Sequence, residues 1–427
     1  MKEKLYLKSI LLMMSSITLA SCSVGPDFKK PEINPPISFT REVNLGMNLS
    51  SEKSLIDAAW WKAYGSEEIN SLVDTALKNN PDIESGIANL RVAQANVRAQ
   101  QGLFFPSIGA GYSLTRQNVG PVLQSSVNSG AQIYNLNTAG LSVGFAPDIF
   151  GGNRRLVESL KALGNSQSYQ LEALRTTIAN NVVATAIQEA TLREQVKAVR
   201  ELANASQLQL EHARRRRAAG YSSSIDLAVQ ESLYAQSVSQ VPVLEKAREQ
   251  SLNLLAVLCG KMPNEKLLLP SIDSIKIPNP LPTSIPSQFV EQRPDIKIAG
   301  EYVRAANAQV GVAVANMLPQ ISLTGNIGNV ATLFGDLADS ANSVWSITGG
   351  IAQPIFQGGT LFARKRAAEA GLDAAISQYK STVLNAFQNV ADTLYAIEAD
   401  GKYYKTAREN EVANKVIYDQ SDRQLKT

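Results

Sequence analysis

Residues 152–220 read GNRRLVESLKALGNSQSYQLEALRTTIANNVVATAIQEATLREQVKAVRELANASQLQLEHARRRRAAG, and this stretch decides the fold. No proline occurs between Pro147 and Pro242. The stretch is dense in Ala, Leu, Gln, Glu and Arg, which lose little rotamer freedom in a helix. It predicts a single helix that would span roughly 100 Å at about 1.5 Å per residue, about three times the diameter of a small domain.

One face of this helix carries the alternating three- and four-residue spacing of a coiled coil, with one slip near Leu192. The positions of this seam are Leu171, Leu174, Ile178, Asn181, Thr185, Gln188, Leu192, Val196, Val199, Ala203, Ser206 and Leu210. Many of them are small or polar, so we expect close packing against other long helices. A soluble coiled-coil stalk would show the same spacing.

The composition is that of a folded protein. Of the 427 residues, 44% are hydrophobic and 19% are charged, which excludes a disordered chain. The net charge of +3 comes largely from Lys2, Lys4 and Lys8 near the N-terminus. The nearly neutral remainder predicts no nucleic-acid partner. The two cysteines, Cys22 and Cys259, are too few for a disulfide framework, and Cys259 lies in an apolar run typical of a protein core.

The N-terminus has the pattern of a secretory signal peptide over residues 1–21. Basic residues precede the apolar run Ile10–Met14, and Leu19-Ala20-Ser21-Cys22 follows. This ending resembles a bacterial lipobox, in which the cysteine is acylated and the signal is cut just before it. We therefore predict a covalent lipid on Cys22, while Ser23 matches the outer-membrane sorting pattern of lipoproteins. The alternative is an ordinary signal peptide with an incidental cysteine.

The rest of the chain offers no helical membrane span, because no other stretch approaches about 18 uninterrupted apolar residues. Residues 22–59 are predicted to form an extended tether. Its prolines are Pro26, Pro31, Pro35 and Pro36.

The chain contains an internal repeat. Pro81-Asp82-Ile83 recurs as Pro294-Asp295-Ile296 (294 − 81 = 213), and Phe105-Pro106-Ser107-Ile108 resembles Leu318-Pro319-Gln320-Ile321 at the same offset. Later the offset becomes 207, since Gly152 corresponds to Gly359 (359 − 152 = 207). We predict a first repeat over residues 60–265, a proline-rich linker over residues 266–286 and a second repeat over residues 287–427.

Each repeat also contains two strand-like stretches with a period of two. Their apolar positions are Ile108, Ala110, Tyr112, Leu114, Leu141, Val143 and Phe145 in the first repeat, and Ile321, Leu323, Ile327, Trp345, Ile347 and Ile351 in the second. This weak signal is typical of membrane barrel strands, although a half-buried soluble hairpin would give it too. Four strands cannot close a membrane barrel, which needs about eight, so copies of the chain must cooperate; three copies would give 12 strands.

Taken together, the motifs resemble those of the TolC-like outer-membrane efflux family, in its lipidated, NodT-type subgroup. The resemblance covers essentially the whole mature chain and rests on the order and spacing of several short motifs. These are Ser21–Phe28, Trp60-Trp61, Asn80-Pro81-Asp82, Phe105-Pro106-Ser107, Asp148–Gly152, Leu255–Gly260, Gln292–Ile296, Leu318–Leu323 and Pro354–Gly359.

The resemblance implies a mainly helical protein with a membrane β-barrel. Three chains with four strands each would form a 12-stranded barrel, continued by a long coiled-coil α-barrel across the periplasm. It also implies an outer-membrane location in a Gram-negative bacterium. The expected partners are two further copies, outer-membrane lipid, a periplasmic membrane-fusion adaptor and an inner-membrane pump. The function implied is passive export of drugs or other small compounds, with no cofactor beyond the lipid on Cys22.

The long helix is expected to turn back in a hairpin at its C-terminal end. Arg214, Arg215, Arg216 and Arg217 precede Gly220 and Tyr221, and Ser222–Asp226 opens the return helix. Glycine is a common helix stop, cations suit the C-terminal end of the helix dipole, and serine caps the next helix. By family analogy, this tip is also a candidate adaptor contact.

The family pattern is incomplete at the C-terminal end. Adding the offset of 207 to Gly220 gives the last residue, Thr427, so the second repeat is expected to lack its return helix of roughly 40 residues. The sequence therefore leaves open a truncated, non-conducting chain.

An enzyme is not expected. The only histidine, His212, lies beside the tip arginines, and the sequence contains no Gly-x-Ser-x-Gly, phosphate loop or paired Cys/His metal spacing. A lipid-anchored coiled-coil adhesin or spacer is the competing class. It would explain the tether and the long helix but would leave the duplicated strand pairs without a role.

Overall fold

The computed structural model describes residues 23–31, 59–120, 130–277 and 292–426. Its contacts divide the chain into two compact units. The first unit comprises residues 1–34, 91–167 and 296–384, and the second comprises residues 35–90, 168–295 and 385–427. The predicted signal peptide, Cys22, residues 32–58 of the predicted tether and residues 278–286 of the predicted linker lie outside the described residues.

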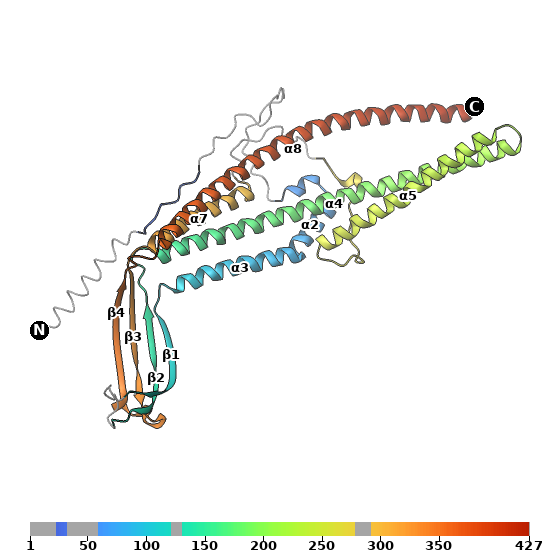
Figure 1. Ribbon diagram of the computed structural model, residues 1–427. Coiled ribbons are helices and arrows are strands. Elements are labelled where there is room, and N and C mark those ends of the chain that lie inside the picture. The colour runs from blue at the N-terminus through green and yellow to red at the C-terminus, as the bar shows by residue number, and fades with distance from the viewer. Residues whose placement is uncertain (1–22, 32–58, 121–129, 278–291, 427) are drawn as a thin grey trace. The chain divides into compact units, whose positions relative to one another are not determined.

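The described elements occur in a repeated order (Figure 1). Along the chain they are η2 (Trp60–Tyr64), α2 (Glu67–Asn79), α3 (Pro81–Gly102), β1 (Ser107–Asn118), β2 (Ile133–Phe145), α4 (Gly152–Ala218), α5 (Ser224–Leu258), η3 (Ile272–Ser274), α7 (Pro294–Ala315), β3 (Gln320–Ala331), η4 (Phe334–Ala338), η5 (Ser340–Asn342), β4 (Ser343–Ala352) and α8 (Thr360–Lys426). A 22-residue helix, two strands and a 67-residue helix appear twice. The predicted long helix is confirmed as α4.

The first unit is built on one antiparallel sheet with strand order β1-β2-β3-β4 (Figure 1). All four predicted strands are confirmed. Each repeat contributes one strand pair, and the ladder between β2 and β3 joins the repeats, from the pair Asn137 and Ala331 to the pair Phe145 and Leu323. Residues far apart in the sequence therefore share one continuous set of backbone hydrogen bonds.

A pair of facing glycines lies in the middle of that ladder. Gly140 is registered opposite Gly328. A Cβ atom on Gly328 would lie 2.3 Å from the carbonyl oxygen of Ala139, and one on Gly140 would lie 2.7 Å from the carbonyl oxygen of Ile327. Both neighbours are backbone atoms that cannot turn aside, so the close approach of β2 and β3 requires glycine at both positions.

The core of the second unit lies where α2 packs against α4 and α5. Ile69 and Val73 of α2, Val182 of α4 and Leu255 of α5 are completely buried. Cys259 is also completely buried, and its thiol donates to the carbonyl oxygen of Leu72 at 3.6 Å. Burial raises the pKa of this thiol. The prediction that Cys259 is a core residue is therefore confirmed.

The predicted seam of α4 needs one correction. Asn181 and Gln188 are exposed, whereas their neighbours Val182 and Glu189 are buried. The slip in the three-and-four spacing therefore occurs at Ile178 and not near Leu192. The predicted spacing placed Gln188 in the seam, whereas the buried position is Glu189, although a carboxylate is rarely buried completely unless it is paired.

Glu189 is buried because two arginines accompany it. Its Oε1 atom accepts a hydrogen bond from Nε of Arg248 on α5 at 2.9 Å, and its Oε2 atom lies 3.6 Å from Nη1 of Arg193, one turn along α4. Arg193 also donates to the carbonyl oxygen of Pro270, beyond the end of α5. The three charges therefore connect α4, α5 and the segment that follows.

Alanine at Gly140 or Gly328 should destabilise the sheet by about 1–3 kcal/mol, the usual cost of overpacking. The control is Gly111→Ala on β1, because a Cβ atom there would meet nothing within 4 Å. The measurement is the free energy of unfolding from urea titrations of the detergent-extracted chain. Equal midpoints for Gly328→Ala and Gly111→Ala would contradict the close approach.

Removing the buried carboxylate with Glu189→Ala should cost about 1–3 kcal/mol, because two arginines whose side chains are 31% exposed would lose their common partner. The control is Glu245→Ala, which breaks a pair with Arg200 whose side chains are 62% and 42% exposed. Exposed pairs contribute at most about 1 kcal/mol. Urea unfolding of both variants measures the difference, and similar losses would refute the role given to Glu189.

Candidate functional site

The sheet presents one extended apolar face to the outside of the chain. Cross-strand register aligns Leu141 with Ile327 and Ile327 with Trp345, so their side chains lie on the same face. We call this the apolar sheet face, and its large members are all exposed, up to 80% for Ile347. They are Ile108, Tyr112, Leu114, Leu141, Val143, Leu323, Ile327, Trp345, Ile347 and Ile351. Contiguous exposed apolar patches of this kind mark protein or membrane contacts.

The middle of the opposite face is polar and almost free of bulk. We call it the polar sheet face. Its polar and glycine residues are Gly109, Gly111, Ser113, Thr138, Gly140, Ser142, Thr324, Asn326, Gly328, Ser346, Thr348 and Gly350, and the same rows contain two apolar residues, Val330 and Val344. Arg116 is the only charged residue within the four described strands, and its register places it beyond Leu114 on the apolar sheet face. A sheet with one apolar and one uncharged polar face suits a boundary between lipid and water.

The two outer strands keep one open edge each. In the described sheet, β1 pairs only with β2, and β4 pairs only with β3. Their other backbone donors and acceptors need partners in any environment that excludes water. The sheet therefore has the properties of a segment of a larger assembly.

The predicted hairpin tip is confirmed between α4 and α5 (Figure 1). Gly220 adopts a left-handed backbone with φ +81°, and the N–H of Tyr221 donates to the carbonyl oxygen of Arg216 at 2.8 Å. Tyr221 is 78% exposed. Ser223 and Asp226 then cap α5 reciprocally. The backbone N–H of Asp226 donates to Oγ of Ser223 at 3.1 Å, and the backbone N–H of Ser223 donates to Oδ2 of Asp226 at 2.9 Å.

The tip arginines do not act as one group. Arg214 pairs with Glu231 of α5 at 3.2 Å, Arg215 pairs with Glu211 of α4 at 3.8 Å, and Arg217 donates to the carbonyl oxygen of Ser222 at 3.5 Å. All four arginines are exposed. Two of the cations are thus partly neutralised within the hairpin, and the tip remains an exposed cationic surface.

The predicted lipidation site adjoins ordered backbone. Cys22 lies outside the described residues, but Ser23 follows it immediately. The N–H of Val24 donates to the carbonyl oxygen of Phe150, just before α4, at 3.2 Å. The backbone at Val24 is therefore held within the first unit, the unit that contains the sheet.

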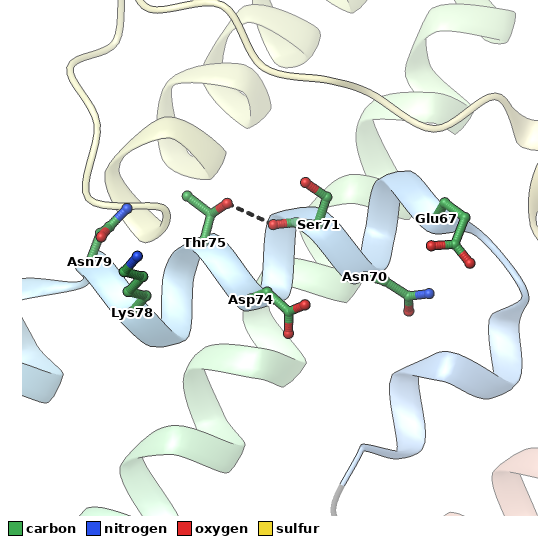
Figure 2. Close-up of a pocket in the computed structure, with 7 residues that line it drawn as sticks. All are labelled: Glu67, Asn70, Ser71, Asp74, Thr75, Lys78 and Asn79. Carbon is green, nitrogen blue, oxygen red and sulfur yellow. Dashed lines mark hydrogen bonds between the residues drawn. The ribbon is translucent and has the colours of Figure 1, made fainter.

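A hollow of about 450 Å³ lies beside α2 (Figure 2). Figure 2 shows polar side chains from one helix along it, and the hydroxyl of Thr75 donates to the carbonyl oxygen of Ser71 at 2.7 Å. Its lining residues are Glu67, Asn70, Ser71, Asp74, Thr75, Lys78 and Asn79. The lining combines two carboxylates and one amine with hydroxyl and amide groups, and it contains no histidine or cysteine.

The described residues hold no group of three or more His, Cys, Asp or Glu side chains that could bind a metal ion. A search of the described helices finds none that is long and apolar enough to cross a membrane.

The sequence of the chain matches the profile of the outer membrane efflux proteins over residues 72–261 and 285–427. The chain belongs to this family. Pyoverdine export outer membrane protein OpmQ of Pseudomonas aeruginosa is 29% identical and aligns with 97% of this chain and 87% of its own length. Probable efflux pump outer membrane protein TtgC of Pseudomonas putida is 27% identical over 98% of this chain and 87% of its own length. Nodulation protein T of Rhizobium leguminosarum is 24% identical over 94% of this chain and 85% of its own length.

Solved structures of the family share this fold. The CmeC outer membrane channel of Campylobacter jejuni superposes with a TM-score of 0.81 at 26% identity, covering 93% of this chain and 84% of its own. The outer-membrane channel OprN gives a TM-score of 0.79 at 26% identity, and the superposition covers 90% of this chain and 84% of OprN. The resemblance inferred from the sequence motifs is confirmed.

The cap of α5 should weaken at low pH. Hydrogen bonds from the backbone N–H and the side chain of Ser223 hold the pKa of Asp226 below its ordinary 3.8. A lowered folded-state pKa means that the stabilisation is present above 3.8 and is lost as the pH falls through the folded-state value. As the pH is lowered, hydrogen-exchange protection of residues 223–228 should therefore decrease in the wild type. In Asp226→Asn the protection should be low at every pH. Identical pH profiles in the two chains would refute the cap.

Proposed function

We propose that this chain is the outer-membrane channel component of a tripartite efflux system. In this role it supplies a passive duct for drugs or other small compounds that an inner-membrane pump delivers through a periplasmic adaptor, and it performs no catalytic step. The observation that carries the proposal is the apolar sheet face, which is exposed over all four strands and backed by an uncharged polar face. Membership of the outer membrane efflux protein family supports it.

The open sheet edges support a trimer. Four strands per chain fall short of the roughly eight that a membrane barrel needs, so β1 of one copy must pair with β4 of another. Three copies would close a 12-stranded barrel, with the apolar sheet faces toward outer-membrane lipid and the polar sheet faces toward water. The 67-residue helices α4 and α8 would continue the duct as a coiled-coil α-barrel into the periplasm.

The sequence repeats give the domain plan of this channel. Residues 1–21 would be the lipoprotein signal peptide and residues 22–59 the acylated tether. Residues 60–265 and 287–427 would be the two channel repeats, with residues 266–286 between them. The lipid on Cys22, such as palmitate, would hold each copy at the outer membrane, since each buried CH₂ group contributes about 0.8 kcal/mol.

The names of relatives mention different cargos, among them pyoverdine, toluene and cations. We propose that the pump selects the cargo for this chain too. The uncharged polar sheet face supports this, because it offers no fixed charge with which to choose among solutes.

The native mass of the full chain, extracted from outer membranes in mild detergent, tests the assembly. The expected result is three times the protomer mass, with ion conductance after reconstitution into a planar bilayer. A monomer without conductance would overturn the channel function.

Replacing Arg216 and Arg217 by glutamine should reduce crosslinking of the adaptor to the hairpin tip and lower efflux together. The control is Arg200→Gln, which removes an exposed cation from the middle of α4. Surface charges steer association, and the effect should therefore shrink as the salt concentration rises. Unchanged crosslinking in the tip variant would refute the adaptor contact.

A further inference from the structure

Residues 23–28 lie against α4 and α7 in the first unit, where side chains of both helices bond to their backbone. Ser23–Phe28 contacts the start of α4 and one side of α7, with Val24 bonded to Phe150 as described above. We call this segment the N-terminal strap. The segment has no regular secondary structure of its own, so its position depends on what holds it from outside.

Arg155 on the first turn of α4 holds the strap by its backbone. Its Nε donates to the carbonyl oxygen of Val24 at 3.0 Å, and its Nη2 donates to that of Gly25 at 3.3 Å and to Oδ1 of Asp27 at 3.0 Å. Its Nη1 donates to Glu158 at 2.9 Å. Arg155 is only 4% exposed, whereas the Asp27 side chain is 93% exposed. The two carbonyl contacts therefore matter more than the solvated ion pair.

Helix α7 holds the strap from its other side. Nδ2 of Asn307, a residue only 5% exposed, donates to the carbonyl oxygen of Pro26 at 2.9 Å. The guanidinium of Arg304, one turn earlier on α7, lies over the ring of Phe28 at 4.9 Å from its centroid. Donors on α4 and α7, and hence on both sequence repeats, are thus used by one short peptide.

Glycines allow the strap to lie this close. A Cβ atom on Gly25 would be 2.4 Å from Cα of Gly311 on α7, and one on Gly311 would be 2.8 Å from Cγ of Arg155. A Cβ atom on Gly151 would be 2.8 Å from Cα of Ser23. Gly25 also has φ +94°, which favours glycine. The strap therefore packs closely against the surface formed by Arg155, Asn307 and Gly311, which we call the groove.

Within the described residues the groove occurs once, although the sequence is duplicated. The repeat offset of 207 places Phe362 where Arg155 stands, and Phe362 is 64% exposed. The offset of 213 places Arg98 where Gly311 stands, so a side chain would fill the space that the strap needs. Only one repeat junction kept the guanidinium and the glycine, which matches one N-terminus per chain.

We propose that the groove of Arg155, Asn307 and Gly311 is an intramolecular binding site for the N-terminal strap, which fixes the acylated residue at the base of the sheet. The strap joins α7, which leads into β3, to α4, which follows β2. It therefore also holds the two repeats together where their strands begin and end. The anchoring role rests on the lipoprotein proposed above, whereas the docking of the strap does not.

Hydrogen exchange of peptide 23–31 in the full-length, detergent-extracted chain tests the docking. Arg155→Met should speed exchange at least about tenfold, because it removes two charge-assisted hydrogen bonds to the strap backbone. Asp27→Asn should change it by less than about threefold, since the ion pair is solvated. Unchanged exchange in Arg155→Met, or equal acceleration by Asp27→Asn, would overturn the proposal.

A second pair of variants leaves every polar group in place. Gly25→Ala should release the strap, because the new Cβ atom collides with Gly311. Gly358→Ala is the matched control: Gly358 also has positive φ, +60°, but a Cβ atom there meets nothing within 4 Å. Hydrogen exchange of the strap that is slow in both variants, or fast in both, would contradict close packing of Gly25 against Gly311.

Labelling the same cells with palmitate separates the two claims. Label on the wild type together with strap release in Arg155→Met and Gly25→Ala supports an anchor fixed by docking. An unlabelled wild type would overturn the lipid anchor and with it the anchoring role, while the exchange comparison still decides whether the strap is docked.

Discussion

The ladder between β2 and β3 is the interaction on which the first unit depends. It is the only described strand pairing that crosses from one sequence repeat to the other, and it places the strand pairs of both repeats in one sheet. Backbone hydrogen bonds fix the register, and register decides which side chains share a face, because a shift by one residue would exchange the two faces. The Gly140 and Gly328 pair lets the two strands approach within this ladder.

Once the register is set, the character of the sheet follows from simple alternation. One face gathers most of the large apolar side chains of four strands, and the middle of the other consists of glycine, serine, threonine and asparagine apart from Val330 and Val344. Water is a poor solvent for the first face, and lipid is a poor environment for open strand edges. The channel proposed above would solve both problems, because several copies would close into a ring with its apolar face in a membrane. The physical argument and the family membership therefore lead to the same function.

Two buried charges show where reasoning from sequence stops. Glu189 occupies the interior of the second unit because Arg193 and Arg248 meet it there, although Arg248 is 59 residues away in the sequence. Arg155 is buried in the first unit because carbonyl groups of the N-terminal strap reach it. Arg193 follows Glu189 by four residues and belongs to a local pattern, but Arg248 and the strap carbonyl groups do not. The seam predicted for α4 therefore omits Glu189, and the motif Ser21–Phe28 indicates the family but not its contacts with Arg155.

The sequence alone determined the long helix, the four strands, the hairpin at Gly220 and the family, because each depends on local periodicity, local turn chemistry or motif order. Proline-free length, a period of two and a glycine followed by serines are properties of neighbouring residues. Tertiary structure alone decided which helix positions are buried, how the two repeats share one sheet, and that the strap lies against Arg155 and Asn307. These depend on atoms brought together from distant parts of the chain, where one hydrogen bond or one missing Cβ atom selects the partner.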